Sequence, residues 1–398
     1  MRVLMLTHNM AGLGGSFQRA WSIARGLAGW GVEVTLLASR RSPGLHRIAS
    51  DVSGIQVIEM GDLFPERLRH GGLSPMDVAG RLGFVRSHGY DLVHGFDHRP
   101  AVSLPALAAR RRWGIRYVAD WADLWGKGGI AGERRGPPGW LLAQMDDGWE
   151  RHVHAAADAA TVISSYLEAR VLELGVPPDR VCRVAVGSNT DIIRPRAKDE
   201  MRRKYGVPLE AKVLVHTGFA PYDRGMLMET LKHLAVSEPA ALLLLTGGES
   251  IPVTTAVEQA GLGGMVRGFG VVPYEDLGEI LACGDVMLLP LRDRPLNVAR
   301  FPNRFGDYLA AGRPIATNRT GDVGEVVERE RVGIVAPAEP RAFAEAILRL
   351  LDDPRLCEAM GRRARALAET RYSWHALVEP LHRLYQLLVG TAPRRAQE

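Results

Sequence analysis

The chain has 398 residues, of which 46% are hydrophobic and 24% charged, a composition typical of a folded globular protein long enough for two domains. It contains no apolar run of the roughly 18 residues that a membrane helix needs, and its three scattered cysteines exclude a disulfide framework or a cysteine-rich metal cluster. The net charge of +5 favours anionic partners, but no zinc-finger spacing or aromatic RNA-binding motif is present, so we expect a cytoplasmic protein without a nucleic-acid partner.

The first half of the chain alternates short apolar strands with helical stretches. It begins with a strand over Val3–Leu6, a glycine-rich turn, and a helix over Arg19–Leu27. Further strands are expected at Val32–Leu37, Ile55–Ile58, Leu92–His94, Tyr117–Ala119 and Ala160–Ile163. This order predicts a parallel sheet with helices on its faces, the doubly wound α/β class.

The glycine-rich turn after the first strand contains Gly14 and Gly15. Glycine lets a ligand approach the backbone, and the N-terminus of the following helix favours an anion. Tight strand-to-helix turns also need glycine when no ligand is present, so a purely structural role is the alternative. The turn matches neither the dinucleotide fingerprint nor the Walker A sequence, which argues against a nicotinamide cofactor and against ATP hydrolysis.

Two strand-exit segments in the first half carry side chains suited to an acceptor or a reacting centre. These side chains are Asp97, His98, Asp120 and Asp123, the last two among tryptophans suited to sugar contact. The structural alternative makes the two carboxylates at 120 and 123 turn or cap residues and His94 a satisfied core histidine. Two carboxylates without further ligands are poor support for a metal site, and we expect none.

The stretch Gly126–Gly139 is rich in Gly, Arg and Pro and is expected to be a surface segment. Within it, Arg134-Arg135 stand close to the apolar sequence Trp140-Leu141-Leu142. That pairing suggests a peripheral contact with the inner membrane face and a lipid-linked acceptor. A loop leading into a buried helix is the alternative.

A segment rich in turn formers, Val186–Pro195, separates the two halves. We therefore expect a first domain over residues 1–190 and a second over residues 195–372. The last helical stretch, residues 373–390, completes the first domain. Strands of the second domain are expected at Val213–Thr217, Ala241–Leu245, Val266–Phe269, Val286–Leu289, Ile315–Ala316 and Gly333–Val335.

Glycines also end strands in the second half. Gly218 follows the strand Val213–Thr217, and Arg224 stands just before the next helix, where its guanidinium could clamp a diphosphate. Gly248, Gly268 and Phe269 end the next two strands on the same predicted edge. Glycine there would allow a flat base to lie against the backbone.

The segment from Arg300 to Ile315 leads from a buried strand through a loop into a helix that Gly312 ends. Asn303, Arg304 and Asp307 place donors beside one carboxylate at the helix start. This mixture suits a ligand with phosphates and sugar hydroxyls. The alternative is an ordinary helix start, with Asn303 as cap and Asp307 on a solvated face.

In this order, the segments resemble those of glycosyltransferases of the GT-B fold, and among them the retaining family 4. The resemblance rests on six pieces: Gly14–Arg19, Leu174–Val181, Asn189–Pro195, Thr217–Met226, Pro302–Pro314 and Tyr372–Trp374. It implies two Rossmann-like domains facing a cleft. It also implies metal-independent transfer of a sugar, with retention, from a UDP- or GDP-type nucleotide sugar to a hydroxyl of a glycan, lipid-linked or small-molecule acceptor, without a cofactor.

The resemblance also implies roles for single residues. Arg224, Asn303 and Arg304 would meet the diphosphate, and Gly14 and Gly15 would close over the phosphates. Asp307 would bind the ribose, and the loop after Gly268 would meet the base. Beside the resemblance, the residues themselves suggest that Asp97, His98, Asp120 and Asp123 face the acceptor and the reacting centre as candidate catalytic groups, with Arg224.

The chain departs from the family pattern at five positions. Ala299 and Asp307 stand where the family has two glutamates, Phe219 and Arg224 stand at the arginine and lysine positions of the diphosphate loop, and Ala122 stands at a histidine position. These departures motivate an alternative from another class, a non-catalytic GT-B protein that binds a nucleotide sugar or a glycan. A GT-B epimerase or phosphorylase is a further alternative, although a phosphorylase would need a richer anion site.

Overall fold

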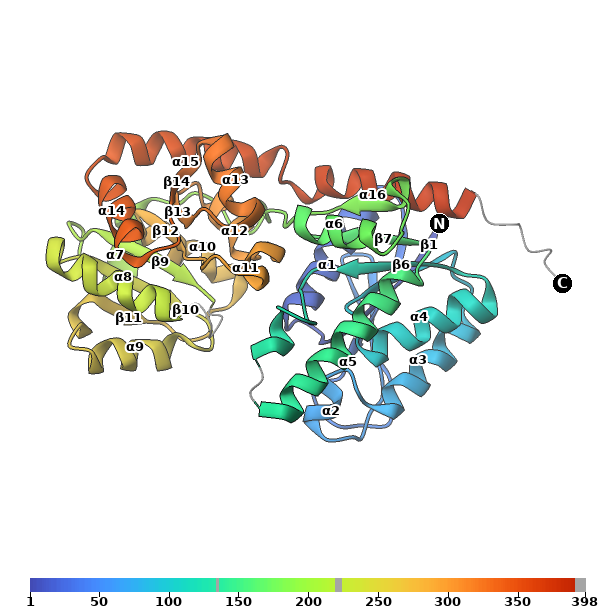
Figure 1. Cartoon of the computed structure of the whole chain (residues 1–398). Helices are drawn as coiled ribbons and strands as arrows, with labels where there is room; N and C mark the ends of the chain where they lie inside the picture. Colours follow the sequence, from blue (N-terminus) through green and yellow to red (C-terminus); the bar gives the residue numbers. More distant parts are fainter. Residues whose placement is uncertain (134–135, 219–223, 391–398) are drawn as a thin grey trace. The chain divides into compact units, whose positions relative to one another are not determined.

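The computed structural model describes residues 1–133, 136–218 and 224–390, and the chain forms two compact units (Figure 1). Unit 1 combines Met1–Ala185 with the C-terminal segment that starts at Trp374, and unit 2 is Val186–Ser373. Each unit is built on its own sheet.

Unit 1 contains an eight-stranded sheet of order β3-β4-β2-β1-β5-β6-β7-β8. All neighbours pair in parallel except β3, which is antiparallel to β4. Its strands are β1 (Arg2–Met10), β2 (Glu33–Ser39), β3 (Ile48–Val52), β4 (Ile55–Glu59), β5 (Leu92–Phe96), β6 (Arg116–Trp121), β7 (Ala159–Val162) and β8 (Val181–Arg183). Its helices are α1 (Gly15–Ala28), α2 (Glu66–His70), α3 (Pro75–Ser87), α4 (Pro100–Trp113), α5 (Gly136–Ala155), α6 (Ser165–Glu173) and α16 (Trp374–Gly390).

Successive residues of β1 face opposite layers of helices, as the two-residue period of a strand requires. Val3 and Met5 pack with residues of α1 and α16, whereas Leu4 and Leu6 pack with residues of α3, α4 and α5. The strand is therefore buried on both faces, which explains its nearly continuous apolar sequence.

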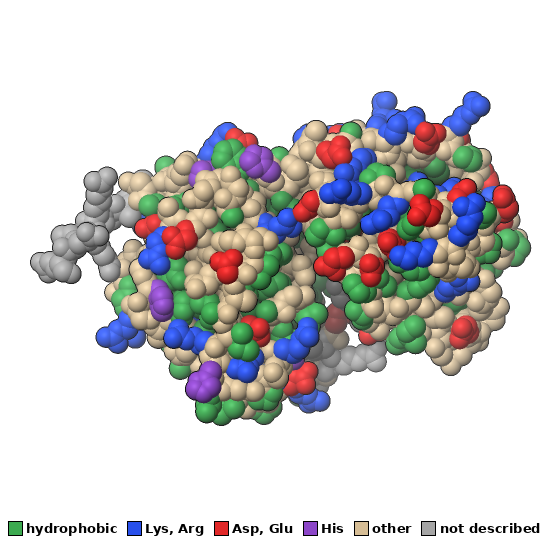
Figure 2. Space-filling view, turned by 180° about the vertical axis from the view of Figure 1, so that it is seen from behind, with side chains coloured by type: hydrophobic (Ala, Val, Ile, Leu, Met, Phe, Trp, Pro, Cys, Tyr) green, Lys and Arg blue, Asp and Glu red, His purple; other side chains and the backbone are tan. Residues whose placement is uncertain are grey.

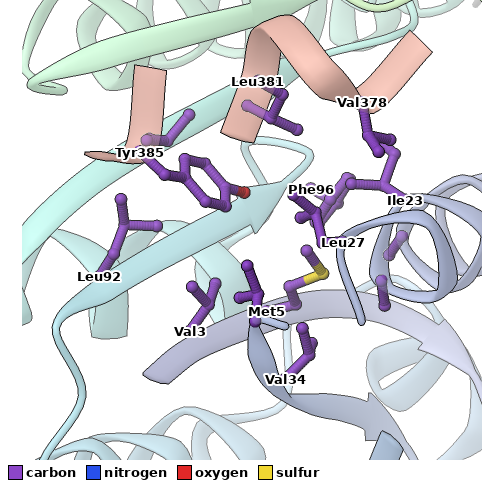
Figure 3. Packing of buried hydrophobic residues seen from close by; sticks show 14 of the residues in the cluster. Val3, Met5, Ile23, Leu27, Val34, Leu92, Phe96, Val378, Leu381 and Tyr385 are labelled. Atoms are coloured by element: carbon purple, nitrogen blue, oxygen red, sulfur yellow. The ribbon is translucent and has the colours of Figure 1, made fainter. Parts of the chain in front are cut away.

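The C-terminal helix α16 belongs to the core of unit 1 (Figure 3). Val378, Leu381 and Tyr385 point from it toward strand residues of the sheet and toward α1. A Cβ atom on Gly26 of α1 would lie 2.8 Å from a methyl of Val378, so the close approach of these helices depends on glycine there.

Unit 2 contains a fully parallel six-stranded sheet of order β11-β10-β9-β12-β13-β14. Its strands are β9 (Val213–Thr217), β10 (Leu242–Thr246), β11 (Val266–Gly268), β12 (Val286–Leu289), β13 (Ile315–Asn318) and β14 (Gly333–Ala336). Its helices are α7 (Lys198–Lys204), α8 (Arg224–Ser237), α9 (Ser250–Gln259), α10 (Tyr274–Cys283), α11 (Pro295–Ala299), α12 (Arg304–Ala311), α13 (Gly321–Glu330), α14 (Pro340–Leu351) and α15 (Pro354–Glu369).

The predicted doubly wound α/β class is confirmed, and every predicted strand is present within a few residues of its expected bounds. Strands β3 and β8 were not predicted. All five residues of β3 are exposed and β8 has only three residues, so neither contains a buried apolar run. The expectation of a surface loop over Gly126–Gly139 was wrong in part. A short 3-10 helix covers Ile130–Glu133, and α5 already begins at Gly136.

Candidate functional site

In unit 1, the sheet order reverses at β1, which lies between β2 and β5, and ligands of open α/β sheets bind at such a switch point beyond the carboxyl ends of the strands. Thr7 of β1 pairs with Phe96 of β5, so the residues that follow them, His8 and Asp97, lie near each other. This edge carries the first candidate site.

Asp97 sits between two histidines. One carboxylate oxygen lies 3.1 Å from Nδ1 of His98, and the other lies 3.7 Å from Nδ1 of His8. The carboxylate also accepts hydrogen bonds from the backbone N–H groups of His98 and Arg99. Asp97 adopts φ 88°, which few residues other than glycine tolerate, so the backbone is strained where the carboxylate is presented.

The electrostatics of this cluster favour an ion pair. Burial alone would raise the pKa of Asp97, but His8 and His98 outweigh that effect and the pKa is lowered. Burial alone would lower the pKa of His98, but the Asp97 carboxylate outweighs burial and the pKa is raised. The Asp97 carboxylate therefore favours the protonated form of His98.

Glu150 of α5 is buried beneath this edge and was not found from the sequence. It accepts hydrogen bonds from the Trp121 indole and from the backbone N–H groups of Trp125 and Gly126, and burial raises its pKa. Trp121 is almost fully buried and stacks on His154, so it is not exposed for a sugar to pack against. Glu150 and His154 thus hold the Trp121 ring inside, in a segment whose tryptophans were expected to suit sugar contact.

Asp120 is also buried, and its two carboxylate oxygens each accept a hydrogen bond of 2.8 Å from the Arg19 guanidinium. Arg19 further donates to the carbonyl of Val184. Arg19 outweighs the effect of burial and lowers the pKa of Asp120. This ion pair ties α1, which begins at the glycine turn, to the centre of the sheet.

The same carboxylate ends a chain of buried hydrogen bonds. Thr161 donates to Asp120 at 2.5 Å, and the ring of His94 contacts Thr161 at 2.9 Å and the hydroxyl of Tyr385 at 2.5 Å. Burial lowers the pKa of His94 to about 3, so the ring is neutral. Because Thr161 donates to Asp120, it accepts from Nε2 of His94, and Nδ1 then accepts from Tyr385 of α16. His94 is thus a satisfied core histidine.

The start of α1 is capped from an unexpected position. Oδ1 of Asn9 accepts hydrogen bonds from the backbone N–H groups of Ser16 and Phe17. Gly14 has φ 86°, and a Cβ there would lie 2.5 Å from Oδ1 of Asn9, so glycine is required for this cap. A Cβ on Gly15 would meet nothing within 4 Å, which leaves open space on that side of the turn.

A small pocket gathers several of the residues singled out in the first half. Its lining includes Ser16, Asp97, His98, Asp120, Trp121, Asp123 and Trp125. The guanidinium of Arg99 lies over the Trp125 ring, 4.0 Å from its centroid, and approaches Asp146 of α5 at 3.5 Å. The four predicted residues of unit 1 are therefore brought to one edge, with Asp120 engaged by Arg19 and Asp123 half-buried.

In unit 2, the order of the strands reverses at β9, which lies between β10 and β12. The backbone segments that follow β9 and β10 lie close to each other. A Cβ on Gly247 would be only 3.0 Å from Cα of Gly218. Gly218 has φ 60°, and among the described residues nothing lies within 4 Å of where its Cβ would be; the same holds for Gly248, which is exposed. Gly268 instead packs tightly against α9, and the Phe269 ring lies edge-on against Tyr205.

Helix α12 begins beside this strand end. Nη1 of Arg304 donates to the carbonyl of Gly218 at 2.8 Å and contacts Nε2 of His216 at 2.9 Å. Burial, followed by the charges of Arg304 and Arg300, lowers the pKa of His216 well below its usual value, so the imidazole is neutral. The edge is therefore cationic, which suits an anionic ligand.

Asp307 lies one turn into α12, where its carboxylate accepts a hydrogen bond of 2.7 Å from the hydroxyl of Tyr274. The amide of Asn189 donates to the same hydroxyl. Burial raises the pKa of Asp307 to about 6. The alternative interpretation, an ordinary helix start, placed Asp307 on a solvated face and made Asn303 the cap. Both parts are wrong, because Asp307 is not exposed and the Asn303 side chain makes no capping hydrogen bond.

The remaining predicted residues of unit 2 lie at element ends. Arg224 is the first residue of α8 and is half-buried. Ala299 is the last residue of α11 and is fully buried. Phe219 lies outside the described residues. Within the described part of the chain, no group of three His, Cys, Asp or Glu side chains is placed to hold a metal ion, and no helix there is long and apolar enough to cross a membrane.

Comparisons with known proteins agree with this architecture. The family model of the glycosyl transferase 4-like domain matches residues 14–187, and that of glycosyl transferases group 1 matches residues 211–353. The D-inositol 3-phosphate glycosyltransferase of Thermomonospora curvata is 25% identical over 396 residues, covering 91% of this chain and 88% of that protein. The glycogen synthase of Mycobacterium tuberculosis is 25% identical over 418 residues, covering 97% and 94%.

Solved structures show the same fold. The sucrose-phosphate synthase of Thermosynechococcus elongatus superposes with a TM-score of 0.79 at 18% identity, covering 98% of this chain and 99% of that one. The Anabaena protein HepE in complex with UDP-glucose gives a TM-score of 0.73 at 17% identity, covering 98% and 100%. Fold and family models together define a glycosyltransferase of the GT-B fold. The chain belongs to the family 4-like glycosyltransferases.

Proposed function

We propose that this chain transfers a sugar from a UDP- or GDP-type nucleotide sugar to a hydroxyl acceptor, with retention and without a metal ion. The observation that carries the proposal is the edge of unit 2, where Arg304 at the start of α12 holds the backbone of Gly218 one helical turn from the Asp307 carboxylate. Cation and carboxylate at this spacing match a diphosphate and a ribose. The complex of HepE with UDP-glucose supports the UDP-type donor.

The leaving diphosphate gains negative charge as the bond to the sugar breaks, and preformed cations stabilise that charge without rearrangement. In our proposal, Arg304 and Arg224 face the diphosphate, together with Asn303 and the N-terminal amides of α12. Asp307 accepts hydrogen bonds from the ribose hydroxyls. Gly218 and Gly248 leave room for the nucleotide, and the segment of Gly268 and Phe269 lies toward the base.

Unit 1 supplies the acceptor side of the proposal. Asp97 and His98 form a buried ion pair at the switch point, and Asp123 lines the same small pocket. In a retaining transfer, the bond between the sugar carbon and the diphosphate oxygen breaks while the acceptor oxygen bonds to that carbon on the same face. The acceptor proton then passes to the departing phosphate oxygen, so no protein base is required. The raised pKa of His98 fits this scheme, since the ring donates a hydrogen bond to the acceptor rather than taking its proton.

Exposed apolar side chains on α5 support a lipid-linked acceptor reached at a membrane surface. Trp140 is 65% exposed and Met145 63% exposed, and Leu141 and Leu142 are exposed beside them. Singly exposed apolar residues need no explanation, but four of them on two turns of one helix form a patch that fits the interfacial region of a bilayer.

A thermal-shift screen against UDP, GDP, ADP and TDP and their common sugars, with EDTA present, tests the donor proposal. Stabilisation by UDP- or GDP-type ligands is expected, and the shift should grow with ligand concentration as binding to the folded state requires. Stabilisation that is seen only when EDTA is left out would overturn metal independence.

Ala299 and Ala122, at the glutamate and histidine positions of the family pattern, favour a second candidate, a GT-B protein that binds the nucleotide sugar without turning it over. A turnover assay distinguishes the two candidate functions. Donor hydrolysis or transfer above the buffer rate supports the enzyme, and tight binding with no turnover across an acceptor panel supports the binding protein.

A further inference from the structure

A cavity of about 780 Å³ lies in unit 2 at the edge of the sheet opposite to the proposed nucleotide site. Lys212, Asp285 and Pro314 line it, and they immediately precede β9, β12 and β13. Gly218 and the start of α12 lie beyond the other ends of these strands, so the cavity is separate from the nucleotide edge. Its volume is in the range of small-molecule sites.

The walls of the cavity are rich in cations, most of which are already engaged. Arg202 donates to Asp285 and to the carbonyls of Cys283, Leu209 and Ala211. Lys198 pairs with the same Asp285 at 2.9 Å. These groups build the wall, and they do not by themselves call for a ligand.

Arg313 is different. It lines the cavity two residues beyond the last residue of α12, and Nη2 donates to the carbonyl of Ala282 at 3.0 Å. Within the described part of the chain, its buried Nε has no hydrogen-bond partner, and the Asp285 carboxylate that acts on its charge is shared with Lys198 and Arg202. Burial lowers the pKa of Arg313, which shows that the environment disfavours its charge.

The guanidinium of Arg313 is half-buried, its Nε has no hydrogen-bond partner, and the Asp285 carboxylate near it already pairs with Lys198 and Arg202. An anion that enters the cavity would supply the missing acceptor and further negative charge. The planar guanidinium fits phosphate oxygens in a bidentate geometry. Arg362 of α15 is exposed on the wall of the same cavity, where its pairing with Glu358 on one helix turn is a weak surface contact. Arg313 and Arg362 therefore give the cavity one half-buried and one exposed cation.

We propose that this cavity is a second ligand site, which takes a phosphorylated small molecule of sugar-phosphate or nucleotide size with Arg313 as its main phosphate contact. The volume exceeds what a bare phosphate fills, so the remainder of the ligand occupies the space along α7 and α15.

Isothermal titration of the full chain tests this site, with and without saturating UDP. The probes are pyrophosphate, glucose 1-phosphate and ATP, each compared with potassium chloride at matched ionic strength. At least one phosphate probe is expected to bind in the presence of UDP, and the last two probes distinguish a sugar phosphate from a nucleotide. Arg313→Gln should weaken that binding about tenfold or more. Arg341→Gln, which changes an exposed arginine of α14 outside the cavity, should leave it unchanged.

Three results would overturn the proposal: no phosphate probe binds, UDP displaces the probe, or Arg313→Gln binds as tightly as the unaltered protein. If Arg313→Gln fails to fold, Arg362→Gln serves instead, because its side chain is exposed and its loss leaves the fold intact. That variant should bind the probe at least about threefold more weakly, and an unchanged affinity would reject the site. UDP binding should be unchanged in both variants. Measuring it separately distinguishes a failure of this second site from a failure of the proposed function.

Discussion

Arg19 and Asp120 are 101 positions apart in the sequence and form a buried bidentate ion pair, with both hydrogen bonds at 2.8 Å. Removing one partner leaves the other charge buried without compensation. Asp120→Ala should therefore lower the free energy of unfolding of unit 1 by about 3–5 kcal/mol, measured by urea denaturation. Glu33→Gln, which breaks the exposed pair with Arg2, should cost less than about 1 kcal/mol. Equal costs for the two variants would contradict the assignment.

The pKa of the His98 ring should depend on the charge of Asp97. Asp97→Asn removes the carboxylate charge, and asparagine tolerates the positive φ of that position better than other replacements. Because the carboxylate raises the pKa of His98 against the effect of burial, the variant should lower it, as read from an NMR titration of the imidazole. Asp146→Asn is the matched control, since Asp146 lies 4.0 Å from the ring and should move the pKa less. A His98 pKa that stays the same in Asp97→Asn would count against the ion pair.

The Asp307 carboxyl predicts how nucleotide-sugar binding depends on pH. Its pKa is raised to about 6, so it is mostly protonated at pH 5 and mostly ionised at pH 7. If the carboxylate accepts from the ribose, UDP-glucose should bind about tenfold more tightly at pH 7 than at pH 5. UDP-glucose is chosen because its diphosphate has no ionisation in that range. Asp307→Asn should bind weakly at both pH values, and a retained pH dependence would assign it to another group.

The same raised pKa has a consequence for stability. A carboxyl whose pKa is higher in the folded state than in the unfolded state makes the fold less stable as the pH rises from about 4 to about 6. Asp307→Asn should remove that decline. Denaturation midpoints of the two proteins at pH 4.5 and 7 measure it, and a larger decline in the variant would contradict the burial of Asp307.

Arg304 should recognise the phosphates rather than the nucleoside. Arg304→Ala is expected to weaken UDP binding about tenfold or more, because a charge-assisted hydrogen bond is lost. Binding of uridine should change much less. Lys232→Ala, an exposed cation of α8, controls for the general loss of positive charge. An equal loss of affinity for UDP and uridine would indicate that Arg304 acts only by holding Gly218.

The apolar patch on α5 should promote binding to vesicles. Trp140→Ser combined with Met145→Ser is expected to reduce co-sedimentation with vesicles that contain anionic lipid, because two large exposed apolar groups are lost. Val236→Ser, which changes an 85% exposed residue of unit 2, should not reduce it. Figure 2 shows the side of the molecule turned away from the viewer in Figure 1, where charged side chains of both signs are interspersed.

The sequence predicted the parts of this fold that depend on local pattern. Apolar runs predicted the strands, and the glycine after Val213–Thr217 and the helix start at Arg304 predicted the edge of unit 2 that we propose as the nucleotide site. Pairings between distant residues left no local signal. Glu150 reaches Trp121 from the middle of a helix, and Tyr274 reaches Asp307 across 33 positions. His8 and Asn9 could have been singled out, since polar residues at the end of the first strand precede the glycine turn.

Helix α16 completes the core of unit 1, although unit 2 separates it in the sequence from the rest of that unit. During synthesis, the residues of unit 2 leave the ribosome as one uninterrupted segment. The apolar surface of α1 and β1 that α16 covers stays uncovered until that last helix has been made. Loss of the C-terminus through a nonsense codon or proteolysis would therefore damage the unit that begins at the N-terminus. For the same reason, unit 1 expressed alone needs residues 374–390 joined to it, and a fragment ending at Ala185 should aggregate.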